Sequence, residues 1–190
     1  MAGQKTLLAL GALLLGGGCV NAIAADQPTT DGDALLMALD DEYRAEATYA
    51  AILNAFGDVR PFVNIIEAER RHATLARSEL DRLGIAYPDT NPYLGSITAP
   101  ASLLEACEQG ITAEIENIEL YDRIIPTVED EQLRETLGRL QWASRERHLP
   151  AFERCVARGG EMGRGRGHGQ GRGQGRGKGH GNGQGHGPHN

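Results

Sequence analysis

The sequence lacks a long hydrophobic run. Its most apolar stretch, residues 7–15, is too short to cross a bilayer and follows the positively charged Lys5. Ala22 and Ala24 then form the small-residue pattern that is typical of a signal-peptidase site. We therefore expect residues 1–25 to be an export signal that is removed, rather than a membrane anchor, and we expect the mature protein to be periplasmic or secreted.

Cysteine is also scarce, with three residues in a chain of 190. Cys19 follows a run of glycines inside the expected signal, which is compatible with lipid attachment, but no large apolar residue stands three positions before it. A membrane is therefore expected as a partner only if Cys19 is lipidated. Export implies an oxidising compartment, in which the other two cysteines can pair.

No segment shows the alternation of apolar and polar residues that is typical of a β-strand. Within residues 26–158, which we expect to form one domain, apolar residues recur at intervals of three and four, the period of an amphipathic helix. The pattern predicts four long helices, at residues 33–56, 61–83, 101–126 and 129–157. We predict an all-α fold, an antiparallel four-helix bundle in which two helical hairpins are joined by one longer crossover. Pro150 is expected to kink or break the last helix.

Apolar residues are nearly absent from residues 159–190, where glycine alternates with arginine, glutamine and histidine. Such a tail is expected to be disordered, and its excess of basic residues contrasts with the net charge of −7 of the whole chain. It can act as a flexible solubilising extension, or it can contact an anionic surface by charge. It has no aromatic residues for stacking on bases, so nucleic acid is not favoured as a partner. A further interpretation is that four histidines of the tail bind metal ions loosely: His168, His180, His186 and His189.

The third predicted helix carries a carboxylate where an apolar residue is expected. Its core positions are mostly apolar, but Glu114 lies among them, and Tyr121 follows seven residues later. The first predicted helix repeats this layout with Glu42 and Tyr49. A buried carboxylate is unfavourable unless it is paired or binds a metal, so the two glutamates point to a polar site inside the bundle.

The second and fourth predicted helices add imidazoles at core positions. Glu69 and His72 are three residues apart and therefore share a helix face, and His148 lies in the inward stripe of the fourth helix. Carboxylates that can bridge two ions, with one imidazole for each ion, suit iron or manganese. We expect a metal site with two iron ions, or with manganese or a single ion instead. Tyr49 and Tyr121 can donate hydrogen bonds that orient its carboxylates.

These motifs resemble those of the ferritin-like superfamily of di-iron carboxylate proteins, and the resemblance covers all four predicted helices. Residues 144–152 are similar to the fourth helix of an exported branch of that superfamily, known mainly as a domain of unknown function. The resemblance implies a ferritin-like bundle. It also implies that five residues are the metal ligands: Glu42, Glu69, His72, Glu114 and His148.

One position departs from the superfamily pattern. A fourth carboxylate is expected three residues before His148, and the residue there is Arg145. Glu46, one turn beyond Glu42, is a candidate for the missing oxygen ligand. Otherwise Arg145 brings a positive charge near the site, and one of the two ions is weak or absent. The interpretation without a metal is a buried ionic network, in which the same glutamates pair with the two histidines and Arg145.

The two cysteines of the predicted bundle support a common register. Cys107 lies seven residues from Glu114, and Cys155 lies seven residues from His148. If Glu114 and His148 share one level of an antiparallel hairpin, the cysteines face each other about 10 Å further along the axis. We expect a disulfide between them, with two buried free thiols as the alternative.

Three functions are compatible with these residues. The first is an enzyme-like role, in which an iron centre reacts with oxygen or peroxide and ferrous iron is oxidised. The second is a non-catalytic exported protein that binds or sequesters metal ions. The third is a stress or surface protein that kept the fold without a metal. The sequence does not predict the substrate or the oligomeric state.

Overall fold

The computed structural model describes residues 30–161, and the predicted export signal and nearly all of the glycine-rich tail lie outside this range. All regular structure between residues 30 and 161 is helical, without a β-strand, so the predicted all-α class is confirmed. The elements are α1 Asp31–Phe56, α2 Phe62–Leu83, α3 Leu103–Ile124, a short 3₁₀ turn η1 Ile125–Thr127, α4 Glu131–Ala143, η2 Ser144–His148 and α5 Leu149–Ala157. No helix within the described range is both long and apolar enough to span a membrane.

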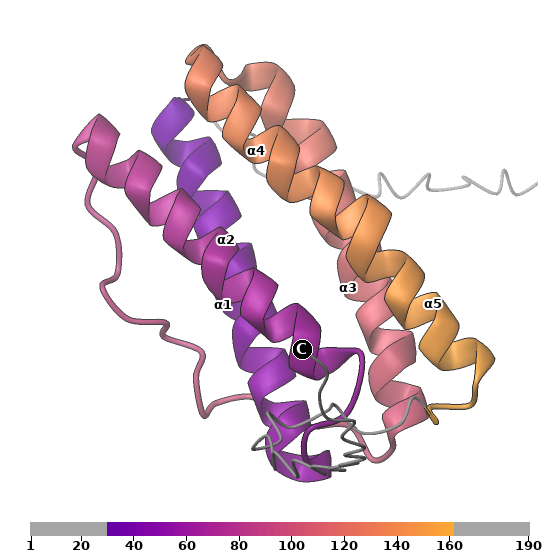
Figure 1. Cartoon of the computed structure of the whole chain (residues 1–190). Helices are drawn as coiled ribbons and strands as arrows, with labels where there is room; N and C mark the ends of the chain where they lie inside the picture. Colours follow the sequence, from indigo (N-terminus) through magenta and orange to yellow (C-terminus); the bar gives the residue numbers. More distant parts are fainter. Residues whose placement is uncertain (1–29, 162–190) are drawn as a thin grey trace, which may run out of the picture.

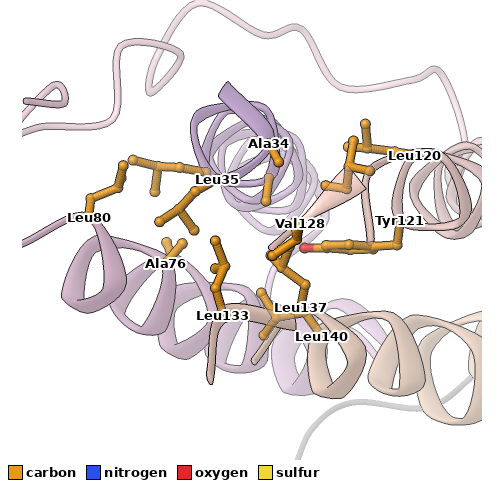
Figure 2. Close-up of a cluster of buried hydrophobic side chains, with 14 of the residues drawn as sticks. Ala34, Leu35, Ala76, Leu80, Leu120, Tyr121, Val128, Leu133, Leu137 and Leu140 are labelled. Atoms are coloured by element: carbon orange, nitrogen blue, oxygen red, sulfur yellow. The ribbon is translucent and has the colours of Figure 1, made fainter. Parts of the chain in front are cut away.

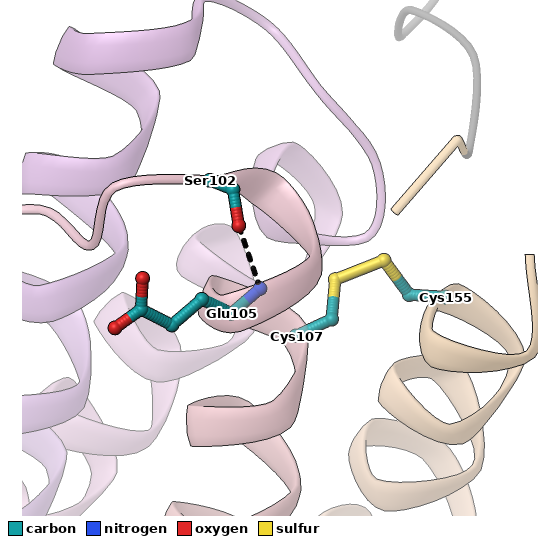
Figure 3. Close-up of a disulfide and its surroundings, with 4 residues drawn as sticks. All are labelled: Ser102, Glu105, Cys107 and Cys155. Atoms are coloured by element: carbon teal, nitrogen blue, oxygen red, sulfur yellow. Dashed lines mark hydrogen bonds between the residues drawn. A yellow bond between two sulfur atoms is a disulfide. The ribbon is translucent and has the colours of Figure 1, made fainter. Parts of the chain in front are cut away.

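Side-chain caps set the helix starts. The hydroxyl of Thr30 accepts a hydrogen bond from the backbone N–H of Asp33 at the start of α1, and Ser102 does the same for Glu105 at the start of α3 (Figure 3). The carboxylate of Asp31 accepts from the backbone N–H groups of Glu129 and Asp130, which ties the start of α1 to the start of α4.

The fourth rod of the bundle is one continuous run of α4, η2 and α5, in which η2 is a π-helical segment of five residues. Pro150 follows directly and lies in the first turn of α5. Proline has no N–H to donate to the preceding turn, and its ring crowds that turn. The wider π-helical turn of η2 makes room for the ring, so the rod continues through Pro150. Pro150 therefore does not break the helix.

The helices pack as a bundle, with α1 along α2 and α3 along the α4–η2–α5 rod (Figure 1). At one end of the bundle an apolar cluster contains side chains from the first half of α1, the second half of α2, the end of α3, and α4. Its members include Leu35, Leu80, Tyr121 and Leu133 (Figure 2). At the other end a second cluster contains Tyr49, Phe62 and Phe152, whose rings lie 5.3 to 5.7 Å apart. The two clusters leave a polar layer between them.

A disulfide joins α3 to α5 inside the second apolar cluster. The sulfur atoms of Cys107 and Cys155 are 2.03 Å apart, and both cysteines are fully buried (Figure 3). The predicted pairing is confirmed, and the alternative of two free thiols is wrong. The bond supports the register that places Glu114 and His148 at one level.

Candidate metal centre

Five buried side chains meet in the polar layer, and we call them the carboxylate–histidine cluster. α1 contributes one glutamate, α2 a glutamate and a histidine, α3 one glutamate, and the last residue of η2 a histidine. Their exposed fractions do not exceed 9%. The members are Glu42, Glu69, His72, Glu114 and His148. The structure thus brings together all five residues that the sequence pattern singled out as ligands.

The cluster consists of two triads that share Glu69. In the first, Nδ1 of His72 lies 3.1 Å from Oε2 of Glu69 and 3.3 Å from Oε2 of Glu42. In the second, Nδ1 of His148 lies 3.1 Å from Oε1 of Glu69 and 3.5 Å from Oε2 of Glu114. The two imidazole rings stack with centroids 5.6 Å apart. Each triad offers ligand atoms that lie within 4.8 Å of one another, which is close enough to surround a cation.

Two tyrosines hold the outer glutamates from opposite helices. The hydroxyl of Tyr49 on α1 donates to Oε1 of Glu114 on α3, and the hydroxyl of Tyr121 on α3 donates to Oε1 of Glu42 on α1, both over 2.8 Å. Burial is the main reason that the pKa of each phenol lies well above its usual 10, so both remain protonated donors. The crossed pair leaves the second oxygen of each glutamate directed at its histidine.

The buried groups of the cluster shift one another's protonation. Burial lowers the pKa of each histidine, but the close contacts and the charge of the neighbouring glutamates outweigh it and raise the pKa to about 9 for His72 and about 10 for His148. Burial raises the pKa of Glu69, but the close contacts with both histidines outweigh it and lower that pKa to about 2. Burial, followed by the charge of Glu69, raises the pKa of Glu42 to about 8. Three glutamates surround two imidazoles, and at pH 7 the cluster limits its negative charge by keeping a proton on Glu42 and on both imidazoles.

Two polar atoms of the cluster lack a hydrogen bond. Oε2 of Glu42 and Nδ1 of His148 are both fully buried, and their ion-pair partners lie 3.3 Å and 3.1 Å away, but neither contact has the angles of a hydrogen bond. A closed ionic network would satisfy such atoms, because an unpaired buried polar group is unfavourable. A cation bound within each triad would satisfy both atoms, since carboxylate oxygens and imidazole nitrogens are its natural ligands. The residues present therefore fit a metal better than a self-contained network.

Arg145 is not near the cluster. Its guanidinium lies on the exterior of the rod, 3.3 Å from the carboxylate of Asp122, and both side chains are about half exposed. The expectation that Arg145 acts beside the site is wrong because the inner face of the rod runs through Ser144 and His148, four residues apart, and Arg145 lies on the exposed side. The buried Ser144 borders a cavity together with Glu69 and Glu114.

Glu46 is not part of the cluster either. Its carboxylate accepts hydrogen bonds from Arg70 at 3.0 Å and from the amide of Asn91 at 3.0 Å. It is therefore bound to the crossover, and the suggestion that it supplies a fourth carboxylate oxygen is wrong. Glu46 lies one turn, about 6 Å, further along α1 than Glu42, and at that height its carboxylate meets Arg70 and Asn91 instead of the histidines.

Sequence reasoning missed a second polar pair next to the site. Asp41 on α1 accepts a short hydrogen bond from the amide of Asn117 on α3, and burial raises the pKa of Asp41 to about 6 despite that bond. Asn117 also lies at a three-residue spacing from Glu114, which was the available signal. Both residues border a cavity of about 140 Å³ between α1 and α3, which we call the acidic cavity. It extends to Glu69 and Glu114 of the cluster.

Comparison with known proteins finds a solved structure with a similar fold. A solved structure, that of hypothetical protein MJ0754 from Methanococcus jannaschii DSM 2661, superposes with a TM-score of 0.62 at 21% identity, over 72% of this chain and 86% of that chain. This likeness shows the fold alone. No protein-family model matches the chain, and no curated protein matches it. The residues that bear on function are therefore those of the cluster itself.

Proposed function

We propose that the chain is an exported protein of the ferritin-like type that binds a pair of transition-metal ions, with iron as the first candidate. The observation that carries the proposal is Glu69, which offers one oxygen to each triad. A carboxylate in that position can bridge two ions, and each ion then has one outer glutamate and one imidazole. The antiparallel, two-hairpin topology of that superfamily is part of the same proposal.

The residues around the cluster suit a site that holds metal away from water. Tyr49 and Tyr121 orient the outer glutamates, and an apolar cluster covers each end of the polar layer. Such hydrogen bonds to ligand carboxylates fix their direction and tune the affinity. When bound, a pair of ferrous ions would supply two one-electron donors for the reduction of oxygen or peroxide. Oxidation of ferrous iron is therefore the activity that we propose.

A specific observation supports a second candidate, a non-catalytic metal-binding protein. The residue that borders the cluster from the fourth rod is the uncharged Ser144, so only three carboxylates, with a total charge of −3, would face two divalent ions, with a total charge of +4. Fewer anionic ligands stabilise a higher metal charge less well. A protein of this kind holds the divalent ions without turnover.

The test of metal binding is equilibrium dialysis of the full chain against ferrous or manganous ion without oxygen, followed by metal analysis. We expect up to two ions per wild-type chain and a drop of at least one ion in Glu69→Gln. The matched control is Glu67→Gln on the same helix, where the carboxylate pairs with Arg70 at the surface. Equal metal content in all three proteins would reject the site and leave the fold without a metal role.

The two candidate functions differ in oxygen uptake. We expect the anaerobically loaded wild-type chain to consume oxygen or peroxide in proportion to added ferrous iron, faster than free ferrous ion does at the same pH. Stable binding of ferrous ion without acceleration over that blank would select the non-catalytic function.

A further inference from the structure

A second cavity, of about 410 Å³, lies on the other side of the cluster, between α2 and the η2–α5 part of the fourth rod. We call it the arginine cavity. Its lining includes both histidines of the cluster, His72 and His148, together with Arg71 and Arg147. The rest of the wall consists of apolar side chains and the amide of Asn64, and no carboxylate lines it.

The two arginines differ from their neighbours in having no acidic partner. On α2, Arg70 pairs with Glu46 and Glu67, whereas no carboxylate in the described part of the chain lies within ion-pair distance of Arg71. On η2, Arg145 pairs with Asp122, whereas Arg147 within the same described range has no such partner. Their N–H donors are therefore available to a ligand.

Arg147 is held in place without being neutralised. Its guanidinium carbon lies 5.1 Å from the ring centre of Trp142, a cation–π contact, and the indole is half exposed. The contact does not neutralise the guanidinium, and no carboxylate of the described residues pairs with it. Such an arginine can donate bidentate hydrogen bonds to an oxyanion.

We propose that the arginine cavity binds a small oxyanion, a phosphate or a carboxylate, next to the two histidines. Planar guanidinium groups match the paired oxygens of both ligands, and the absence of carboxylates from the wall removes competing partners. The volume lies in the range of small-molecule sites rather than of macromolecular interfaces. The acidic cavity on the α1–α3 side has the opposite charge, so a cation and an anion would reach the cluster by separate openings.

The test is isothermal titration calorimetry of the full chain, freed of metal by a chelator, with sodium phosphate at pH 7 and constant ionic strength set by chloride. Because no metal is needed, failure of the metal-binding proposal leaves this result unaffected. We expect saturable binding of phosphate by the wild-type chain. Affinity should fall roughly tenfold or more in the double variant Arg71→Gln/Arg147→Gln, since each guanidinium donates charge-assisted hydrogen bonds.

The matched control is Arg70→Gln/Arg145→Gln, which removes the same charge from adjacent positions of the same elements. We expect its affinity to stay within about twofold of the wild type, because these arginines are already paired. Circular dichroism confirms that both double variants remain folded. An equal loss in both variants, or no saturable binding by the wild type, would overturn the proposal. Titration with acetate in place of phosphate identifies which of the two oxyanions the cavity prefers.

Discussion

At the scale of single residues, the candidate metal centre depends on which atoms face each other. Glu69 divides its two oxygens between two histidines, and each outer glutamate is held by a tyrosine of the opposite helix. The oxygen of Glu42 that is not held by Tyr121 has no hydrogen bond. Replacing any one of these groups should therefore lower the affinity for metal by more than it lowers the stability of the fold.

Tyr121→Phe should weaken metal binding about 10- to 100-fold, the usual effect of losing a group that orients a ligand. The hydroxyl of Tyr121 donates to Glu42, and without it that carboxylate is free to rotate away from His72. The measurement is a competition titration of manganous ion against a chelating dye. Tyr43→Phe is the control, because the hydroxyl of Tyr43 donates to the backbone of Pro88 and not to a residue of the cluster. A similar loss in both variants would contradict the role of Tyr121.

The pKa values predict that metal binding releases protons. In the metal-free protein the pKa is raised to about 9 for His72 and about 10 for His148, so both imidazoles are protonated at pH 7. Metal coordination requires the neutral ring. Apparent affinity should therefore rise with pH from 7 toward 9–10, and fall as acid holds the protons on the rings.

Calorimetric titrations with manganous ion at pH 7, in buffers of different ionisation enthalpy, measure this release. We expect about three protons per chain when both triads are filled, from His72, His148 and Glu42, whose pKa of about 8 keeps it protonated at pH 7, and fewer when a single triad is filled. A binding enthalpy that does not depend on the buffer would contradict the raised pKa values.

At the scale of helices, the close approach of α3 to α5 controls the geometry of the second apolar cluster. A Cβ atom added at Gly110 on α3 would lie 2.7 Å from the ring of Phe152, and that ring is already packed against Tyr49 and Phe62. The disulfide between Cys107 and Cys155 joins the same two helices. This packing sets the distance between Glu114 and His148, one on each side of the interface.

Gly110→Ala should lower the free energy of unfolding by about 1–3 kcal/mol, because overpacking exceeds the gain in helix propensity of about 1 kcal/mol. The control is Gly138→Ala on α4, where an added Cβ has no neighbour within 4 Å. That variant should be more stable than wild type by up to about 1 kcal/mol. Urea unfolding followed by circular dichroism measures both changes. Stabilisation by Gly110→Ala would show that Phe152 can move aside.

At the scale of the whole molecule, an acidic bundle is followed by a basic tail. The whole chain has a net charge of −7, and residues 159–190 contain only one acidic residue, Glu161. The negative charge therefore belongs to the bundle. The buried cluster belongs to the bundle, whereas the four tail histidines lie outside the described residues. Metal binding by the two parts should therefore be separable.

A chain that stops after Glu161 should retain the same number of tightly bound ions as the full chain. The cluster lies entirely within residues 42–148, so the shortened chain keeps all five of its ligands. Dialysis against a series of metal concentrations measures both classes of site. Loss of the tight class on truncation would place the tight site in the tail.

The spacing of residues along the sequence predicted much of the fold and of the site. The three- and four-residue period predicts the four helical rods, and burial of a carboxylate without a partner is unfavourable enough to mark Glu42 and Glu114 as special. The equal spacing of Cys107 and Cys155 from the site predicts their pairing, because an antiparallel register aligns them. These inferences depend only on local periodicity, which a sequence contains directly.

Tertiary structure alone decided the details of the centre. Arg145 points to solvent and pairs with Asp122 on α3, a contact that its spacing from His148 does not predict. Two further features depend on contacts between residues distant in sequence. Glu46 accepts a hydrogen bond from Asn91 of the crossover. The tyrosines of α1 and α3 each donate to the glutamate of the other helix. The sequence by itself determined the helical rods and the five candidate ligands, because both follow from local periodicity. Tertiary structure decided the directions of Arg145, Glu46 and the two tyrosines, because these depend on how neighbouring helices pack.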